Sequence, residues 1–178
     1  MKKQQEVLNK KLMAWIIIGV TVFSSLLGAV IYMLDVYPAV EAQEYSSGSF
    51  SVTPFDYGDG ITAYEPAHIK GGIIFYPEAK VEHTAYEDLM ISIASRGYIC
   101  ILVGMPLNQP ALGRNAAMAL EMRYPQVESW YMCGHGSGAK AAAAYAVKNT
   151  EIFDGVILLG GYSSHDLKGT GLKAISVY

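Results

Sequence analysis

Charged residues are scarce in this chain, and neither sign dominates. Asp, Glu, Lys and Arg together make up 16% of the 178 residues, and the formal net charge is −3. Nucleic-acid binding depends on a basic patch or stripe, and no such patch occurs here beyond the N-terminus. We therefore expect no nucleic-acid partner. The sequence also contains no internal repeats or low-complexity tracts. A length of 178 residues favours one domain with an appendage.

Cysteine is also rare, and its pattern argues against a disulfide framework. The two cysteines, Cys100 and Cys133, each fall in a stretch predicted as a buried strand. If a third strand lies between those two, the thiols are about 9.6 Å apart, or two strand spacings, which is too far for a bridge. Neither their spacing nor a nearby histidine cluster suggests a metal site. We predict two buried free thiols and no metal or other cofactor.

One long uncharged segment stands out in what the chain does contain. Residues 13–34 (MAWIIIGVTVFSSLLGAVIYML) carry no charged side chain. As a helix they would span roughly 33 Å, enough for a hydrocarbon core of about 30 Å. Lysines precede the segment and acidic residues follow it, so the positive-inside rule predicts a cytoplasmic tail at 1–12, a single-pass anchor in the cell membrane at 13–34, and an extracellular domain. A signal peptide cleaved after Ala42 is the alternative.

Beyond the anchor, strand and helix patterns alternate. Residues 35–49 are polar and mixed, which is typical of a tether, and residues 50–178 are predicted to form one domain. The patterns predict a hairpin over 50–64, strands at 71–77, 98–103, 130–133, 155–159 and 172–178, and helices at 84–95, 115–124 and 139–147. The first helix would bury Tyr86, Leu89, Met90 and Ile93, and the second its alanines, methionines and leucines. The fold class is α/β, a three-layer sandwich with a mostly parallel sheet.

The most informative motif is the glycine-rich turn after the strand that ends at Cys133. An apolar strand, a turn and an alanine-rich helix form the layout of a nucleophile elbow, in which Gly-x-Ser-x-Gly holds a serine at the top of a sheet. Gly134 and Gly138 fit that pattern. The central position is Gly136, however, and the only serine of the turn, Ser137, comes one residue late.

The need for small residues decides where the turn is centred. A sharp elbow crowds the positions two before and two after its centre. Counted from Ser137, these positions are His135 and Ala139, and a histidine is poorly tolerated there. Counted from Gly136, both are glycines. We therefore predict a vacant nucleophile position at Gly136, with Ser137 as a displaced candidate nucleophile.

Two nucleotide-binding interpretations compete for the same turn. A Walker A loop fails, because Ala139-Lys140-Ala141 supplies neither the final glycine nor the magnesium-binding hydroxyl. A dinucleotide fingerprint matches Gly134-x-Gly136-x-x-Ala139, so a dinucleotide-binding domain remains a remote alternative. That fingerprint expects an acidic residue at the end of the next strand, where the chain has Leu159 followed by two glycines.

With these motifs the chain resembles the α/β-hydrolase superfamily, and within it the membrane-anchored bacterial proteins of the alpha/beta hydrolase fold-5 type, relatives of dienelactone hydrolases. The resemblance covers the chain from about Gly71 onward and depends on residues 72–77, 98–108, 153–159 and the elbow. It implies a serine hydrolase acting on a small ester-like ligand. It also implies an oxyanion hole made by the backbone N–H of Ser137 and that of Glu78 or Ala79.

The chain departs from the family pattern in two ways. The family serine corresponds to Gly136, and the family's acid and histidine follow later strands, whereas this sequence stops at Tyr178. We therefore expect a C-terminally truncated hydrolase with impaired catalysis, and a non-catalytic surface binding module is the alternative. His165 and Asp166 are expected to be solvated and to cap a turn rather than to catalyse. The oligomeric state is not predicted.

Overall fold

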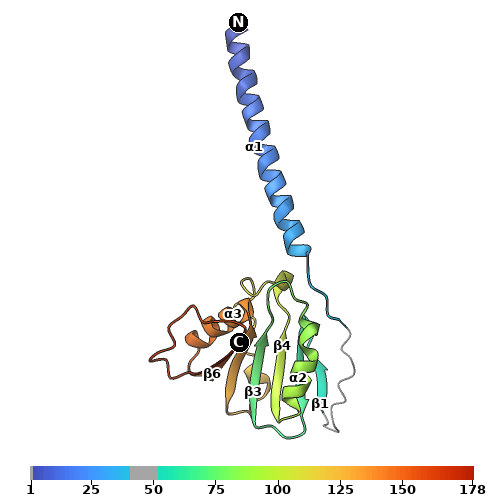
Figure 1. The fold of residues 1–178 in the computed structure, drawn as a ribbon, viewed down its shortest axis with the longest axis vertical. Helices are drawn as coiled ribbons and strands as arrows, with labels where there is room; N and C mark the ends of the chain where they lie inside the picture. Colours follow the sequence, from blue (N-terminus) through green and yellow to red (C-terminus); the bar gives the residue numbers. More distant parts are fainter. Residues whose placement is uncertain (1, 41–51) are drawn as a thin grey trace. The chain divides into compact units, whose positions relative to one another are not determined.

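The computed structural model describes residues 2–40 and 52–178 (Figure 1). The chain divides into two compact units, Met1–Asp35 and Val36–Tyr178, and each is described by itself. Most of the tether predicted for 35–49 and the alternative signal-peptide cleavage point lie outside the described residues.

The first unit is a single helix, α1 (Lys2–Leu34). Its stretch Asn9–Leu34 has a mean hydropathy of 2.3 and exposed side chains. Thr21 Oγ1 donates to the carbonyl of Ile17, and Ser25 Oγ donates to that of Thr21, each at 2.9 Å. These hydroxyls therefore have hydrogen-bond partners within the helix and do not require water. The helix is long and apolar enough to cross a membrane, properties that signal sequences share.

The second unit contains one sheet, whose strand order in the described residues is β1-β2-β4-β3-β5-β6-β7. The strands are β1 (Val52–Asp56), β2 (Ile61–Pro66), β3 (Gly71–Tyr76), β4 (Tyr98–Val103), β5 (Trp130–His135), β6 (Phe153–Leu159) and β7 (Lys173–Val177). The helical elements are η1 (His83–Tyr86), α2 (Glu87–Ala94), η2 (Pro106–Asn108), η3 (Glu121–Arg123) and α3 (Ser137–Lys148). β1 pairs with β2, and β2 with β4, in antiparallel fashion, while the remaining pairs are parallel. The predicted hairpin and mostly parallel sheet are confirmed.

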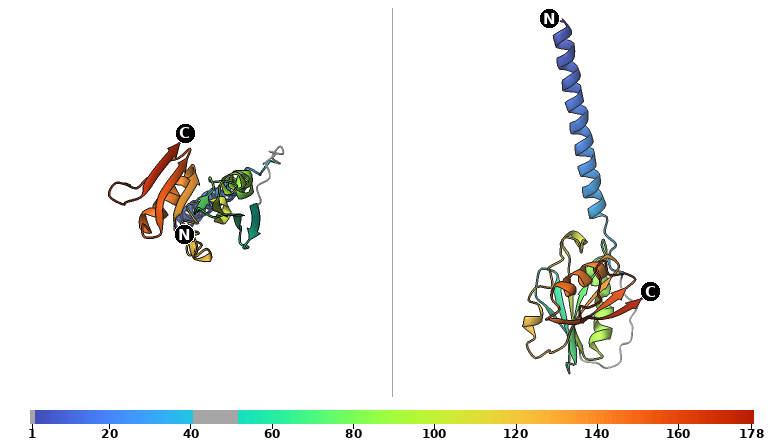
Figure 2. Two further views of the ribbon diagram at one scale, coloured as in Figure 1. Left: turned by 90° about the horizontal axis from the view of Figure 1, so that it is seen from below. Right: turned by 90° about the vertical axis from the view of Figure 1, so that its left-hand side faces the viewer.

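Successive side chains of a strand point to opposite faces of the sheet, so the apolar strands have two faces to bury. Helices cover both of these faces. Ile74 and Met132 lie in a buried cluster with the alanines of α3. Ile73 and Phe75, the neighbours of Ile74 along β3, lie in a second cluster with Met90 of α2. The two views of Figure 2 show α3 against β5 and β6. The predicted three-layer α/β sandwich is confirmed.

The two cysteines lie on either side of β3. Cys100 in β4 is in register with Ile73, and Cys133 in β5 is in register with Phe75. Both thiols are buried and free. Burial raises the pKa of the Cys133 thiol to about 12 and raises that of Cys100 as well. Both thiols are therefore protonated near neutral pH and act as small core side chains.

The helix predicted for 84–95 is divided in two. Its first turn is the 3₁₀ segment η1, and α-helical hydrogen bonding begins only at Glu87. Met90 and Ala94 are buried, whereas Leu89 is 37% exposed. The prediction that Leu89 faces the core is wrong: Met90 and Ala94, four residues apart in α2, form the buried stripe, and Leu89 lies beside it.

The helix predicted for 115–124 does not form, and that prediction is wrong. Only Glu121–Arg123 is helical, as the 3₁₀ turn η3, and Ala119 has a φ of 61°. Met118 and Met122 are 71% and 73% exposed, although their pattern predicts that they face inward. A right-handed helix cannot continue through the left-handed backbone of Ala119. The segment is held by a tertiary contact: the Tyr76 hydroxyl accepts from the N–H of Ala117 at 2.8 Å and donates to the carbonyl of Arg114 at 3.2 Å. The buried Ala117 N–H thus has a side-chain acceptor outside any helix.

Replacing Tyr76 by phenylalanine should therefore destabilise the domain. The change leaves the buried Ala117 N–H without its acceptor, which costs about 1–3 kcal/mol. Urea unfolding of the full chain in detergent measures the loss. Tyr162→Phe is the matched control, because Tyr162 is 58% exposed and its hydroxyl makes no comparable contact. Equal stability of the two variants would show that the Tyr76 hydroxyl does not hold the 114–117 segment.

Candidate functional site

The turn between β5 and α3 is sharp and centred on a residue with an unusual backbone conformation. Gly136 has φ 49° and ψ −112°, and its N–H donates to the carbonyl of Leu159 at 2.9 Å. Side chains other than hydrogen are strained at such angles, whereas glycine adopts them readily. The residue at the apex of this turn therefore has a conformation suited to glycine and carries no reactive atom.

The residues two before and two after Gly136 have no room for a side chain. A Cβ atom on Gly134 would lie 2.6 Å from the carbonyl carbon of Gly138. A Cβ on Gly138 would lie 2.2 Å from the carbonyl oxygen of Pro77 and 2.3 Å from that of Tyr76. The two crowded positions are therefore symmetric about Gly136, as in an elbow whose centre is that residue.

The carboxylate of Glu78 lies directly at the apex of the turn. Its Oε2 accepts from the N–H of Ser137 at 2.9 Å, and its Oε1 accepts from the N–H of Ala79 at 2.8 Å. Oε1 also accepts from Ser137 Oγ at 2.5 Å. The N–H groups of Ser137 and Ala79 were both expected as oxyanion-hole donors. In the structure both donate to the carboxylate of Glu78.

Ser137 contacts that same loop and not a histidine. Its Oγ donates to Glu78 and accepts from the N–H of Ala79 at 3.0 Å. The ring of His135, the last residue of β5, instead shares a 2.8 Å hydrogen bond through Nδ1 with the hydroxyl of Tyr86. In the described part of the chain, no histidine is hydrogen-bonded to Ser137, so its hydroxyl lacks the imidazole base of a serine hydrolase and donates to the carboxylate of Glu78 instead.

Tyr86 joins the turn to the loop after β3, a contact that the sequence did not predict. The N–H of Glu78 donates to the Tyr86 hydroxyl at 3.2 Å. Burial raises the pKa of Tyr86, and the nearby negative charge of Glu78 adds to the rise. The phenol is therefore neutral at physiological pH. Of the two N–H groups expected as oxyanion donors from this loop, that of Glu78 is engaged with Tyr86, and only that of Ala79 faces the turn.

His165 and Asp166 lie in the exposed loop between β6 and β7. The N–H of His165 donates to Ser163 Oγ at 3.1 Å, and Asp166 Oδ1 accepts from the N–H of Lys168 at 2.9 Å. Both hydrogen bonds join residues two apart in the sequence, as is typical of a solvent-exposed loop with a capped turn. No hydrogen bond within residues 52–178 links either side chain to Gly136.

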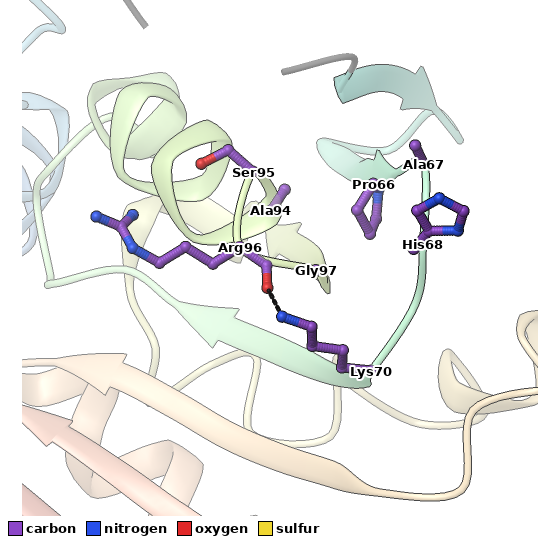
Figure 3. Close-up of a pocket in the computed structure, with 8 residues that line it drawn as sticks. All are labelled: Pro66, Ala67, His68, Lys70, Ala94, Ser95, Arg96 and Gly97. Atoms are coloured by element: carbon purple, nitrogen blue, oxygen red, sulfur yellow. Dashed lines mark hydrogen bonds between the residues drawn. The ribbon is translucent and has the colours of Figure 1, made fainter. Parts of the chain in front are cut away.

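A cavity of about 480 Å³ lies at the other end of the parallel strands. Its lining comes from the end of β2, the loop before β3, and the end of α2 with the turn after it. As Figure 3 shows, it consists of Pro66, Ala67, His68, Lys70, Ala94, Ser95, Arg96 and Gly97. The Lys70 ammonium donates to the carbonyl of Arg96 at 2.9 Å. The elbow lies at the carboxyl ends of β3 and β5, so this cavity is separate from it. Ligand sites of α/β sheets lie at the carboxyl ends.

Comparison with known protein families identifies the class of protein. Residues 72–178 match the model of the alpha/beta hydrolase family, which is more than half of the chain. The chain therefore belongs to the alpha/beta hydrolase family. No match was found among the curated proteins.

Solved structures with the same fold are distant in sequence. TT1662 from Thermus thermophilus is 14% identical with a TM-score of 0.51, over 69% of this chain and 63% of that one. A brefeldin A esterase, a bacterial homologue of human hormone sensitive lipase, is 14% identical with a TM-score of 0.51, over 80% of this chain and 48% of the esterase. The chain thus spans less than two thirds of either protein, and the likeness is one of fold.

Proposed function

We propose that this protein is an exported, membrane-tethered hydrolase of the alpha/beta fold whose ester-hydrolysing chemistry is impaired. The apolar helix α1 anchors it in the cell membrane, with the N-terminal lysines on the cytoplasmic side. Family membership supports hydrolysis of small esters or related acyl compounds as the ancestral reaction.

The observation that carries the proposal is the identity of the residue at the apex of the turn. Gly136 has the backbone conformation of a strained turn, φ 49° and ψ −112°, yet offers no oxygen for attack on an ester carbonyl. Removing the serine of a catalytic triad lowers kcat by about 10⁶, and what remains is on the order of 10³–10⁴ over water. Ser137 does not replace it, because it lies one residue past the centre of the turn and its hydroxyl is held by Glu78 and Ala79, with no histidine partner among the described residues.

A non-catalytic binding module is the second candidate, and one contact favours it. The two N–H groups that would stabilise an oxyanion already hold a carboxylate, that of Glu78. Such a turn holds a carboxylate without carrying out chemistry on it, and a ligand replaces that carboxylate only when the Glu78 side chain rotates away. Saturable ligand binding by the full chain without turnover would favour this candidate.

Turnover of p-nitrophenyl acetate tests the proposal. We expect the wild-type chain in detergent micelles to release nitrophenol without a burst, at a rate on the order of 10⁶-fold below that of an intact serine hydrolase. Ser137→Ala should not change this rate. Ser164→Ala, in the exposed loop after β6, is the matched control. A burst in the wild type that disappears in Ser137→Ala but persists in Ser164→Ala would overturn the proposal and assign Ser137 as the nucleophile.

A further inference from the structure

The side chain of Glu78 is held as a bound ligand would be. Its two carboxylate oxygens accept three hydrogen bonds, from the N–H of Ser137, the N–H of Ala79 and the Oγ of Ser137, at 2.9, 2.8 and 2.5 Å. Hydrogen bonds to an ionised acceptor are about twice as strong as neutral ones. The three donors converge on a group the size of acetate.

The donors come from two segments that are distant in the sequence. Ala79 belongs to the loop after β3, while Ser137 is the first residue of the 12-residue helix α3. Ala79 N–H and Ser137 Oγ are themselves joined at 3.0 Å, which fixes the spacing of the donors. The positive end of the helix dipole also favours a negative charge at this point. The cradle is therefore built by the tertiary fold and not by the helix end alone.

Glu78 also fills the space over the apex of the turn. A Cβ on Gly136 would lie 1.2 Å from Glu78 Oε2 and 2.4 Å from its Cδ. No side chain at residue 136, and no acyl oxygen at that point, can be present together with Glu78 in this rotamer. Glu78 is only half-buried, so its flexible side chain can rotate toward solvent while the backbone stays in place.

We propose that Ala79 and Ser137 form a binding site for small carboxylates, and that Glu78 is its resident, self-supplied ligand, which keeps external carboxylates out of the elbow. The inference rests on the proposed centre of the elbow at Gly136, but not on whether the protein is catalytic. The three converging hydrogen-bond donors make the site suited to a carboxylate. Removing the side chain of residue 78 opens it.

Rescue of Glu78→Ala by acetate tests the inference. Thermal unfolding of the full chain in detergent micelles at pH 7 is measured in sodium acetate and in sodium chloride at equal ionic strength. We expect 100 mM acetate to raise the Tm of Glu78→Ala saturably, by about 2–5 °C relative to chloride. The wild type should not respond, because its site is filled. Equal responses of wild type and Glu78→Ala, or none in Glu78→Ala, would overturn the inference.

A neighbouring glutamate provides the matched control. Glu82 lies in the same part of the chain, and its Oε2 accepts one backbone N–H, that of Ala39, at 3.0 Å. Glu82→Ala therefore removes a carboxylate without opening a convergent cradle, and acetate should not raise its Tm. An acetate effect in Glu82→Ala equal to that in Glu78→Ala would mean that the rescue is unspecific, and would overturn the inference.

A second measurement does not depend on the folding of Glu78→Ala. In ¹H–¹⁵N spectra, the amides of Ala79 and Ser137 should both shift upfield in Glu78→Gln relative to wild type, because each loses a charged acceptor. A shift confined to Ala79, the sequence neighbour, would overturn the inference, since Ser137 is 59 residues away in the sequence. Neither readout involves turnover. Failure of the proposed function and failure of this inference can therefore be told apart.

Discussion

Replacing Gly138 by alanine is expected to destabilise the domain by about 3 kcal/mol or more, or to prevent folding. The new methyl group would lie 2.2 Å from the carbonyl oxygen of Pro77 and 2.3 Å from that of Tyr76. Both atoms are backbone, and Tyr76 ends a buried central strand, so neither can rotate away. The overlap is relieved only by moving α3 off the sheet. Urea unfolding followed by the fluorescence of the buried Trp130 measures the loss.

The control for Gly138→Ala is a glycine whose added methyl group meets no other atom. Gly171 lies in the loop before β7, where the methyl group of an alanine would have no neighbouring atom within 4 Å, and its φ is 81°. Gly171→Ala should cost only about 1–2 kcal/mol, from the left-handed backbone alone. A loss at Gly138 no larger than the loss at Gly171 would contradict the close packing of the elbow against β3.

Gly136→Ala should destabilise the wild type by about 3–5 kcal/mol and the Glu78→Ala background by only about 1–3 kcal/mol. The first value combines backbone strain at φ 49° with the loss of the Glu78 hydrogen bonds, since the methyl group would overlap Oε2 and displace it. The second value contains the strain alone. A double-mutant cycle from urea unfolding of four chains should give a coupling of about 2 kcal/mol between the two positions.

Gly169 serves as the control for this cycle. It has a positive φ of 74° and nothing within 4 Å of a methyl group, so Gly169→Ala adds the backbone strain without the overlap. Its cost should be the same in the presence and absence of Glu78. A coupling near zero between residues 136 and 78 would mean that Glu78 does not occupy the apex of the turn.

Local patterns predicted the strands well because each is specified by its own residues. The run from Gly71 to Tyr76 is apolar throughout, and the structure buries all six residues between two helical layers. Crowding in the glycine turn also follows from local backbone geometry, so the crowded positions could be located from the residue types at 134 and 138. Both inferences need only a few consecutive residues.

The segment 115–124 and the side chain of Glu78 could not be predicted in this way. The segment has helix-forming residues, yet the hydroxyl of Tyr76, 41 residues before Ala117, takes its backbone N–H. The sequence assigned a role only to the backbone N–H of Glu78, but the structure shows its carboxylate hydrogen-bonded to a serine 59 residues later. In each case the partner lies far away in the sequence, so the neighbouring residues give no sign of the contact.

The sequence by itself determined the apolar helix, the α/β sandwich and the absence of a side chain at the apex of the turn. These follow from hydrophobic periodicity and from the identity of Gly136, which no fold can change. Only the tertiary structure decided what fills the apex. Packing of the loop after β3 against the first turn of α3 brings the donors of Ala79 and Ser137 together, and convergent donors bind the nearest carboxylate, that of Glu78.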